Sequence, residues 1–310
     1  MKEIVPGQNV LGKIVQDLKK NHWIYFMALP VLAYYLIFHY WPMYGAIIAF
    51  KQFSPGRGIW GSPWVGFDHF ERFISGVYFT RIVRNTIMLN GLNLLFGFPA
   101  SILLALLLNE LRSNIFKKVV QTVSYLPHFI SIMVICGMII DFTRSRGIIN
   151  DIIAFFGGPR VSLMLWPENF RFIYVISEIW QQVGWGSIIY LAALAAIDQQ
   201  LYEAAKIDGA GRFKQALSIT LPGILPTIII LLNLRVGQLM NVGFEKIILL
   251  YNPNTYETAD VISSFVYREG LLNFNFSFSA AVGLFNSVIN FSLVIFANWV
   301  SRKATETSLW

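Results

Sequence analysis

The chain has 310 residues, of which 55% are hydrophobic and 13% charged, and its formal net charge is +7. Soluble domains carry about 25% charged residues, so this composition excludes an ordinary soluble protein and indicates a membrane protein with several spans. Basic segments beside the spans account for the net charge, so we expect no nucleic-acid partner. The single cysteine, Cys136, lies in an apolar stretch and cannot form an intramolecular disulfide.

Six apolar stretches follow one another along the chain, and each reaches the roughly 20 residues needed to cross a bilayer core. They predict transmembrane helices at 23–50, 85–109, 119–140, 172–197, 219–241 and within 271–301. Pro127 interrupts the third stretch, because proline lacks the N–H that a helix interior needs. The expected organisation is a transmembrane domain over 23–301, preceded by a segment at 1–22 and followed by a tail at 302–310.

The side of the membrane that each loop occupies can be predicted from charge and loop length. An even number of spans places both termini on one side, and Lys and Arg favour the cytoplasm. Their density is modestly higher on the side that holds the termini and residues 198–218. The longer loops, 51–84, 142–171 and 242–270, lie on the other side. We therefore expect both termini and residues 198–218 in the cytoplasm, with the long loops outside.

A polar stretch between the fourth and fifth predicted spans reads EAAKIDG at 203–209 and ITLP at 219–222. Asp198 is suited to cap a short helix that follows it, and Gly209 is suited to the left-handed conformation that ends one. We expect a second short helix over 212–218, before Pro222 disturbs the start of the next span. The sequence thus predicts a compact pair of short helices attached to the membrane.

This stretch resembles the EAA loop of ABC importer permeases, in which E-A-A, three residues, G, nine residues and I-x-L-P are fixed. The sequence matches every fixed position. In that family the loop forms a coupling helix that docks into a cleft on a separate ATPase subunit. The resemblance implies an all-α polytopic membrane protein of the type I importer permease fold, with six transmembrane helices and a cytoplasmic coupling loop at 198–222. The residues that would couple to the ATPase are Glu203, Ala204, Ala205, Asp208, Gly209 and Pro222.

Two further stretches, PMYGAIIAFK at 42–51 and GSPWVG at 61–66, are similar to one branch of the maltose-type sugar permeases. That branch contains importers of alginate, aldouronate and rhamnogalacturonan fragments. The resemblance implies a subunit in the bacterial cytoplasmic (inner) membrane that imports oligosaccharides, which we expect to be acidic and to contain uronates. The alternative substrate is a neutral sugar or another small polar solute. The implied partners are a second permease with its own EAA loop, two ABC ATPase subunits and an extracytoplasmic solute-binding protein. ATP and Mg²⁺ would be bound by the ATPase subunits, and no cofactor by this chain.

A sugar pathway needs hydrogen-bonding groups that face a water-filled cavity, because polar groups that face lipid are unfavourable. Amide side chains bind hydroxyl groups, and indole rings can cover the apolar face of a sugar. The candidate pathway residues on the last three spans are Trp180, Gln181, Gln182, Trp185, Asn233, Arg235, Gln238, Asn241, Asn286 and Asn290. The alternative interpretation is that these side chains join helices to one another.

Arg235 poses a specific choice, because it lies about fifteen residues into the fifth predicted span. A guanidinium at that depth must face water or a partner. It could form an ion pair with Glu178 of the fourth span, or it could face the cavity and bind a sugar carboxylate. We expect Asn93, on the second span, to hold helices together and not to line the pathway.

Several catalytic and metal-binding patterns are missing from the sequence. No phosphate loop of the form G-x-x-x-x-G-K-[ST] occurs, so we expect no ATP site on this chain. The four histidines are scattered and the cysteine is single, so we expect no metal site. We also expect no catalytic residues. A membrane enzyme, and a membrane scaffold or receptor without transport, remain alternative interpretations.

Overall fold

The computed structural model describes residues 17–305, so 1–16 of the predicted N-terminal segment and 306–310 of the predicted tail lie outside the described part. Every regular element in the described part is helical, and a single isolated bridge joins Lys51 to Trp64. The longer helices are α2 (His22–Tyr35), α6 (Phe79–Leu92), α7 (Phe98–Glu110), α8 (Asn114–Tyr125), α9 (Ile132–Thr143), α11 (Pro167–Ala195), α14 (Leu221–Val236) and α18 (Phe276–Thr305).

Short helices and tight or wide helical turns connect these elements. The short α-helices are α3 (Trp41–Met43), α4 (Gly58–Gly61), α5 (Asp68–Ile74), α10 (Ile148–Phe155), α12 (Gln199–Ile207), α13 (Arg212–Gln215), α15 (Phe244–Leu250), α16 (Tyr256–Ala259) and α17 (Ile262–Tyr267). Wide π turns are η1 (Leu36–Tyr40), η3 (Asn93–Gly97), η6 (Ala216–Thr220) and η8 (Arg268–Leu272). Tight 3₁₀ turns are η2 (Tyr44–Phe50), η4 (Leu126–Phe129), η5 (Leu163–Leu165) and η7 (Pro253–Thr255).

Four continuous helices in the described part are long and apolar enough to cross a membrane. They are His22–Phe50, Phe79–Glu110, Arg212–Val236 and Phe276–Lys303, and they overlap the first, second, fifth and sixth predicted spans. The second helix begins six residues before the predicted span, and the fifth is shifted by five to seven residues toward the N-terminus. A bent pair, Asn114–Phe129 and Ile132–Phe155, adds a fifth candidate at the third predicted span. The helix at the fourth predicted span, α11, has 29 residues but is not among these candidates. Its polar side chains, described below, reduce its hydropathy.

The third predicted span is sharply bent in the structure. Its two parts, α8 and α9, meet at 99° across a short break. Pro127 lies inside η4 at that break, and the chain leaves the helical conformation at Ile130. The interruption that Pro127 predicts is therefore present, although the pattern of residues did not indicate how large the bend is.

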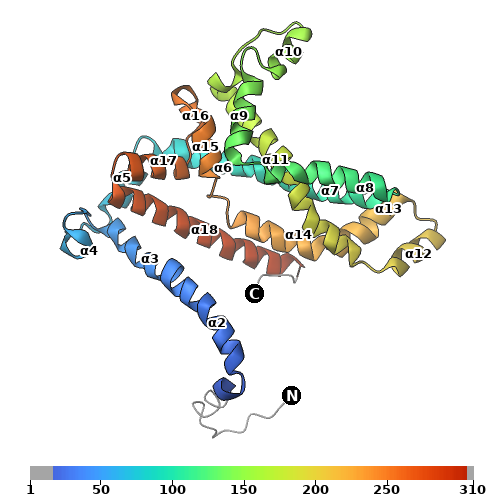
Figure 1. The fold of residues 1–310 in the computed structure, drawn as a ribbon, viewed down its shortest axis with the longest axis horizontal. Helices are drawn as coiled ribbons and strands as arrows, with labels where there is room; N and C mark the ends of the chain where they lie inside the picture. The colour runs from blue at the N-terminus through green and yellow to red at the C-terminus, as the bar shows by residue number, and fades with distance from the viewer. Residues whose placement is uncertain (1–16, 306–310) are drawn as a thin grey trace.

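The helices form an elongated bundle with distinct ends (Figure 1). The helices α7, α8, α14 and α18 run along its long axis, α12 and α13 lie at one end, and α4, α5, α16 and α17 lie toward the other. The α9–α10 arm projects sideways, and α2 leads away from the bundle. No residue of α2 is buried, whereas η2, at the other end of the first span, packs along α18.

Three apolar clusters hold the bundle together. One joins α9, α11 and α15 around buried side chains such as Phe170 and Ile247. A second joins α5, α6, α17 and α18 around Phe73 and Val282. The third lies between α7, α11 and α14, nearer to α12. Fully burying a large apolar side chain contributes about 1.5–3 kcal/mol. The first cluster therefore fixes α11 against α9 and α15, and the third fixes it against α7 and α14.

The helix α11 approaches α8 very closely at Gly184. A Cβ atom at this position would lie 2.0 Å from the backbone oxygen of Ser124, which is far shorter than the distance between two non-bonded atoms in contact. Only glycine therefore allows α11 to lie this close to α8. The same contact sets the position of the polar residues of α11 that flank Gly184.

A buried carboxylate ties the segment between α14 and α18 to α6. Asp260 is completely buried and accepts hydrogen bonds from Arg268 at 2.7 Å and from Arg81 at 3.3 Å. Burial disfavours the charged form of Arg268, but hydrogen bonds with Asp260 outweigh it and raise the pKa of this guanidinium above its ordinary value. A buried charge needs such partners, so this network gives the segment between α14 and α18 a defined position over the bundle.

Candidate functional site

The predicted coupling stretch forms a capped helix, α12. The Oδ1 atom of Asp198 accepts a hydrogen bond from the backbone N–H of Gln200 at 2.9 Å, as an N-cap does. At the other end Gly209 adopts a φ of +75°, and the N–H of Ala210 donates to the carbonyl of Ala205 at 2.8 Å. The cap and the left-handed helix end that the sequence predicts are both confirmed.

The tip of α12 is exposed while its base is fastened to η6, the turn that precedes α14. No residue of α12 is buried, and Ile207 at its end is 88% exposed. At the base, the hydroxyl of Tyr202 lies 3.0 Å from that of Thr220, and Gln215 donates to the carbonyl of Ala210 at 2.7 Å. An exposed helix with a fixed base can transmit a push or pull on its tip into the attached span.

The chain after α12 differs from the expected second short helix. The structure has one continuous helix over Arg212–Val236, in which α13 passes through η6 directly into α14. The wide turn η6 precedes Pro222, which lies in the first turn of α14. A π turn opens the helix locally, so the proline ring is accommodated without ending the helix. The coupling stretch is therefore rigidly continuous with the fifth span.

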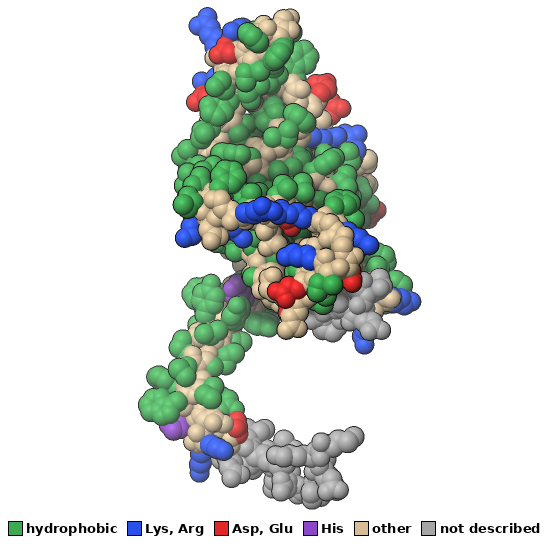
Figure 2. Space-filling model, turned by 90° about the vertical axis from the view of Figure 1, so that its right-hand side faces the viewer, with side chains coloured by type: hydrophobic (Ala, Val, Ile, Leu, Met, Phe, Trp, Pro, Cys, Tyr) green, Lys and Arg blue, Asp and Glu red, His purple; other side chains and the backbone are tan. Residues whose placement is uncertain are grey.

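Lys and Arg side chains gather at the end of the molecule that carries α12 and α13 (Figure 2). The exposed members on these elements and on α8 are Lys118, Lys206, Arg212 and Lys214, and Lys117 beside them is half-buried. Arg212 also lies 3.5 Å from Glu110 in an exposed ion pair, and such pairs contribute little to stability. This end is the one that the sequence predicts to face the cytoplasm.

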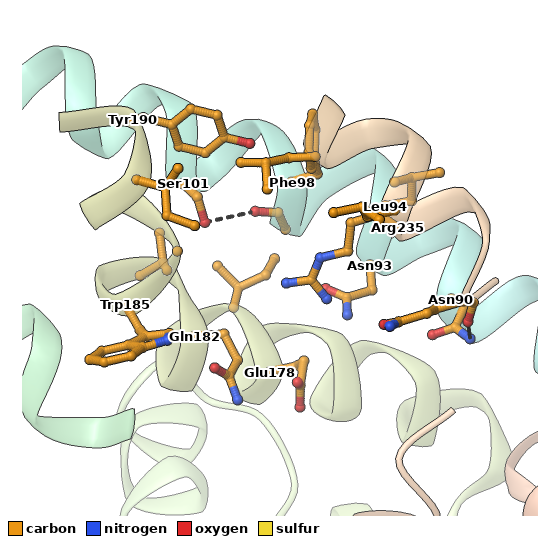
Figure 3. A pocket seen from close by; sticks show the side chains of 18 of the residues that line it. Asn90, Asn93, Leu94, Phe98, Ser101, Glu178, Gln182, Trp185, Tyr190 and Arg235 are labelled. Atoms are coloured by element: carbon orange, nitrogen blue, oxygen red, sulfur yellow. Dashed lines mark hydrogen bonds between the residues drawn. The ribbon is translucent and has the colours of Figure 1, made fainter. Parts of the chain in front are cut away.

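A polar pocket of about 410 Å³ lies in the middle of the bundle. Its walls are the α6–η3–α7 span, α11, α14 and the segment that follows α14. Figure 3 shows polar side chains on three of these walls, with Arg235 of α14 beside Asn93 of η3 and with Glu178 and Gln182 along α11. The polar and charged lining residues are Asn90, Asn93, Ser101, Glu178, Gln182, Tyr190, Arg235, Gln238 and Asn241.

Arg235 presents a free guanidinium to this pocket. Figure 3 shows it directed into the cavity beside Asn93, and its side chain is exposed. Among the described residues it takes part in no ion pair and no hydrogen bond. The chain thus holds a positive charge inside a polar cavity with its five N–H donors available to a ligand.

The alternative prediction that Arg235 forms an ion pair with Glu178 is wrong, because Glu178 pairs with Lys246. The Nζ atom of Lys246 lies 2.8 Å from Oε2 of Glu178, and the two side chains are 3% and 21% exposed. The same ammonium lies 4.9 Å from the centre of the Tyr174 ring. Lys246 belongs to α15, which the sequence places in an outer loop and the structure folds back onto α11.

The ten candidate pathway residues divide into two groups. The structure places Gln182, Trp185, Arg235, Gln238 and Asn241 on the pocket wall. The other five, Trp180, Gln181, Asn233, Asn286 and Asn290, do not line it. Both α18 asparagines donate to Oδ1 of Asn241, Asn286 at 2.8 Å and Asn290 at 3.0 Å. Asn233 is buried and accepts from Ser301 at 2.8 Å, so these amides join α18 to α14 and its continuation.

Five polar pocket residues were not predicted to line a pathway: Glu178 and Tyr190 on α11, and Asn90, Asn93 and Ser101 on the second predicted span. Asn93, expected to hold helices together, lines the pocket together with Asn90 and Ser101. Asn90, Asn93, Gly97 and Ser101 follow one another at intervals of three and four residues, which places them on one helix face. This stripe of polar and small residues was the sequence signal for a second polar wall. Within residues 17–305 no three His, Cys, Asp or Glu side chains gather to hold a metal ion.

One imidazole lies behind the pocket wall. His128, in η4, places its Nδ1 atom 2.9 Å from Oε1 of Gln182. Its ring is parallel to that of Trp185, with the ring centres 4.5 Å apart. No local pattern in the sequence indicates this arrangement, because the partners are 54 and 57 residues away along the chain.

Comparison with known proteins shows the family to which this fold belongs. Residues 97–306 match the family described as the binding-protein-dependent transport system inner membrane component. The chain belongs to this family. Protein LplB of Bacillus subtilis (strain 168) is 45% identical over 294 residues, covering 94% of this chain and 92% of the relative. The polygalacturonan/rhamnogalacturonan transport system permease protein YteP of the same organism is 44% identical over 299 residues, covering 96% and 93%.

Two crystal structures of a bacterial ABC transporter for the acidic polysaccharide alginate have the same fold. One matches with a TM-score of 0.88 and 46% identity, covering 94% of this chain and 99% of the matched chain. The other contains a periplasmic protein with bound alginate pentasaccharide and matches with the same score and identity over 95% and 99%. The predicted all-α polytopic membrane protein of the type I importer permease fold is confirmed. The chain is a multi-pass inner-membrane permease of a binding-protein-dependent system.

Proposed function

We propose that this chain is the permease subunit of an ATP-driven ABC importer that moves oligosaccharides, in particular uronate-containing ones, across a bacterial cytoplasmic membrane. The observation that carries the acidic preference is the free guanidinium of Arg235 in the polar pocket. A planar guanidinium can bind a carboxylate through two parallel hydrogen bonds. The names of the relatives support this choice, because polygalacturonan, rhamnogalacturonan and alginate all carry carboxylates.

The chemistry of the pocket suits a hydroxyl-rich ligand as well as a charged one. Amides from three walls, Asn93, Gln182 and Gln238, can donate to and accept from hydroxyl groups. Trp185, a residue that is 45% exposed, offers an indole ring. A neutral oligosaccharide would use these groups alone, and it is the alternative substrate. An acidic oligosaccharide would use the same groups and Arg235.

The proposed partners follow from the family and from the geometry of α12. A second permease with its own EAA loop would complete the cavity, and an extracytoplasmic solute-binding protein would deliver the sugar. Two ATPase subunits would bind ATP and Mg²⁺, receive the exposed tip of α12, and move it as they close. Because α13 and α14 form one helix, that movement would reach the wall that carries Arg235. Both termini would lie in the cytoplasm with α12.

The test is the substrate selectivity of Arg235→Gln in the importer reconstituted with its partner subunits. Uptake of an oligogalacturonate would be compared with uptake of a neutral oligosaccharide of equal length. A hydrogen bond to a charged group contributes about 1.5–3 kcal/mol, so acidic uptake should fall about 10- to 100-fold while neutral uptake changes little. Arg146→Gln, which removes an exposed arginine outside the pocket, serves as the control. Equal losses for both sugars would contradict the proposed acidic preference.

A further inference from the structure

The position of His128 gives the hydrogen bond to Gln182 a defined direction. The Oε1 atom of an amide can only accept a hydrogen bond, so the Nδ1 atom of His128, 2.9 Å away, carries the proton and donates it. The carbonyl oxygen of Gln182 is then held toward His128. Among the described residues no group accepts a hydrogen bond from the amide nitrogen of Gln182. That nitrogen remains free on a residue that lines the pocket.

The same imidazole also fixes the ring of Trp185. The two rings are parallel within 3° and their centres are 4.5 Å apart. The ring of Phe129, the next residue along the chain, meets Trp185 edge-on, at 86° and 5.6 Å. Two aromatic rings from η4 therefore hold the indole of Trp185, a residue that remains exposed and lines the pocket. A side chain locked in this way loses little freedom when a ligand stacks on it.

We propose that His128 is a positioning residue of the substrate pathway, which sets Trp185 as a stacking platform and turns the Gln182 amide nitrogen toward a sugar oxygen. The inference rests on the proposed function and deepens it. Gln182 and Trp185 are three residues apart on α11, so both lie on one helix face. One sugar ring can therefore stack on the indole while one of its oxygens accepts from the amide.

This arrangement makes the pocket rich in hydrogen-bond donors on two walls. Gln182 offers its amide N–H groups from α11, and Arg235 offers its guanidinium from α14. A sugar bearing a carboxylate presents acceptors at several positions around its ring. The pocket would therefore select a pyranose ring that stacks on Trp185 with acceptor oxygens on either side. His128 sets the α11 wall without contacting the sugar itself.

Three variants separate the two contacts of His128. His128→Phe retains a stacking ring but removes the donor to Gln182, whereas His128→Asn retains a donor close to the Nδ1 position but removes the ring. His128→Ala removes both. The measurement is the number of oligogalacturonate molecules imported per ATP hydrolysed by the complete importer in vesicles. A defect in folding or assembly lowers transport and hydrolysis together, whereas a misplaced pocket wall lowers transport alone.

We expect His128→Phe to lower transport per ATP about two- to tenfold, the range that corresponds to one neutral hydrogen bond. His128→Asn should retain more transport per ATP than His128→Ala. Because the donor acts through Gln182, His128→Phe should cause no further loss in a Gln182→Leu background. The control is His39→Phe on the exposed first span, which should match the unmodified importer.

Two results would overturn the inference. One is unchanged transport per ATP in all three His128 variants, and the other is a full additional loss when His128→Phe is combined with Gln182→Leu. If His128→Phe fails to assemble, the comparison of His128→Asn with His128→Ala decides, and equal values for the two contradict the inference. Failure of the proposed function is a separate result, because the unmodified importer would then import no oligosaccharide.

Discussion

Two basic residues, Lys246 and Arg235, carry charges inside the helix bundle, and the surroundings stabilise these two charges in different ways. A charge at membrane depth must pair or face water. Lys246 is 3% exposed and pairs with Glu178, whereas Arg235 faces the cavity with no ion pair among the described residues. Because Glu178 is already neutralised by Lys246, the charge of Arg235 is available to a ligand.

The ion pair between Glu178 and Lys246 should be important for stability, because it fastens α15 to α11. Removing one partner of a buried pair costs about 3–5 kcal/mol, so Lys246→Met should lower the melting temperature of the purified protein clearly. Glu178→Gln combined with Lys246→Met should recover much of that loss, because the double variant removes both charges and leaves none unpaired. Arg235→Gln serves as the control and should change the melting temperature little. Additive losses in the double variant would contradict the pairing.

The sequence predicted the pathway residues correctly where the type of residue was enough to identify them. Polar side chains on an apolar span point to a cavity or to a neighbouring helix, and five of the ten candidates do line the pocket. The choice between those two environments depends on which way each helix faces. The pairs Glu178–Lys246 and His128–Gln182 join residues 68 and 54 positions apart. No local pattern specifies such partners, so the sequence did not predict them.

At the scale of elements, local chemistry determined the coupling stretch while packing determined the bend between α8 and α9. The cap at Asp198 and the left-handed Gly209 each act within a few residues, so both were predicted correctly. Pro127 indicated an interruption, but the angle of 99° depends on what α8 and α9 pack against. One such contact is the close approach of α8 to Gly184 of α11, which only the folded chain reveals.

The left-handed conformation of Gly209 gives a sharp test of the coupling role of α12. Gly209→Val should strain the helix end, because a β-branched residue at a φ of +75° is strongly disfavoured. We expect normal insertion of the permease but weak co-purification of the ATPase and little ATP-driven uptake. The matched control is Gly211→Val, since Gly211 has an ordinary φ of −67° and open space around it. Glu203→Lys, which reverses an exposed charge in the middle of α12, should also impair uptake. Normal uptake with Gly209→Val and Glu203→Lys combined would remove the coupling role.

The whole molecule explains why the hydropathy of single helices does not identify every span. Four helices are apolar enough to be recognised alone, whereas α11 is not among them. It is nevertheless the central helix, in contact with α7, α8 and α14, and it supplies Glu178, Gln182 and Trp185 to the pocket. A helix with neighbours on several sides can carry polar groups toward a cavity and still lie in a membrane. The most polar span is therefore the one most involved in the proposed pathway.

The orientation of the molecule in the membrane follows from its two distinct ends and can be tested with single cysteines. The end with α12 gathers Lys and Arg side chains, as cytoplasmic segments do, and α10 lies on the arm that projects sideways from the bundle. Cys136 is the only cysteine and is buried, so Cys136→Ala gives a background without thiols. Ile207 and Phe155 are 88% and 84% exposed, and each can be replaced by cysteine. An impermeant thiol reagent added to intact cells should label Phe155→Cys and should reach Ile207→Cys only after the membrane is opened. Labelling of Ile207→Cys from outside would reverse the orientation and would separate α12 from any cytoplasmic ATPase.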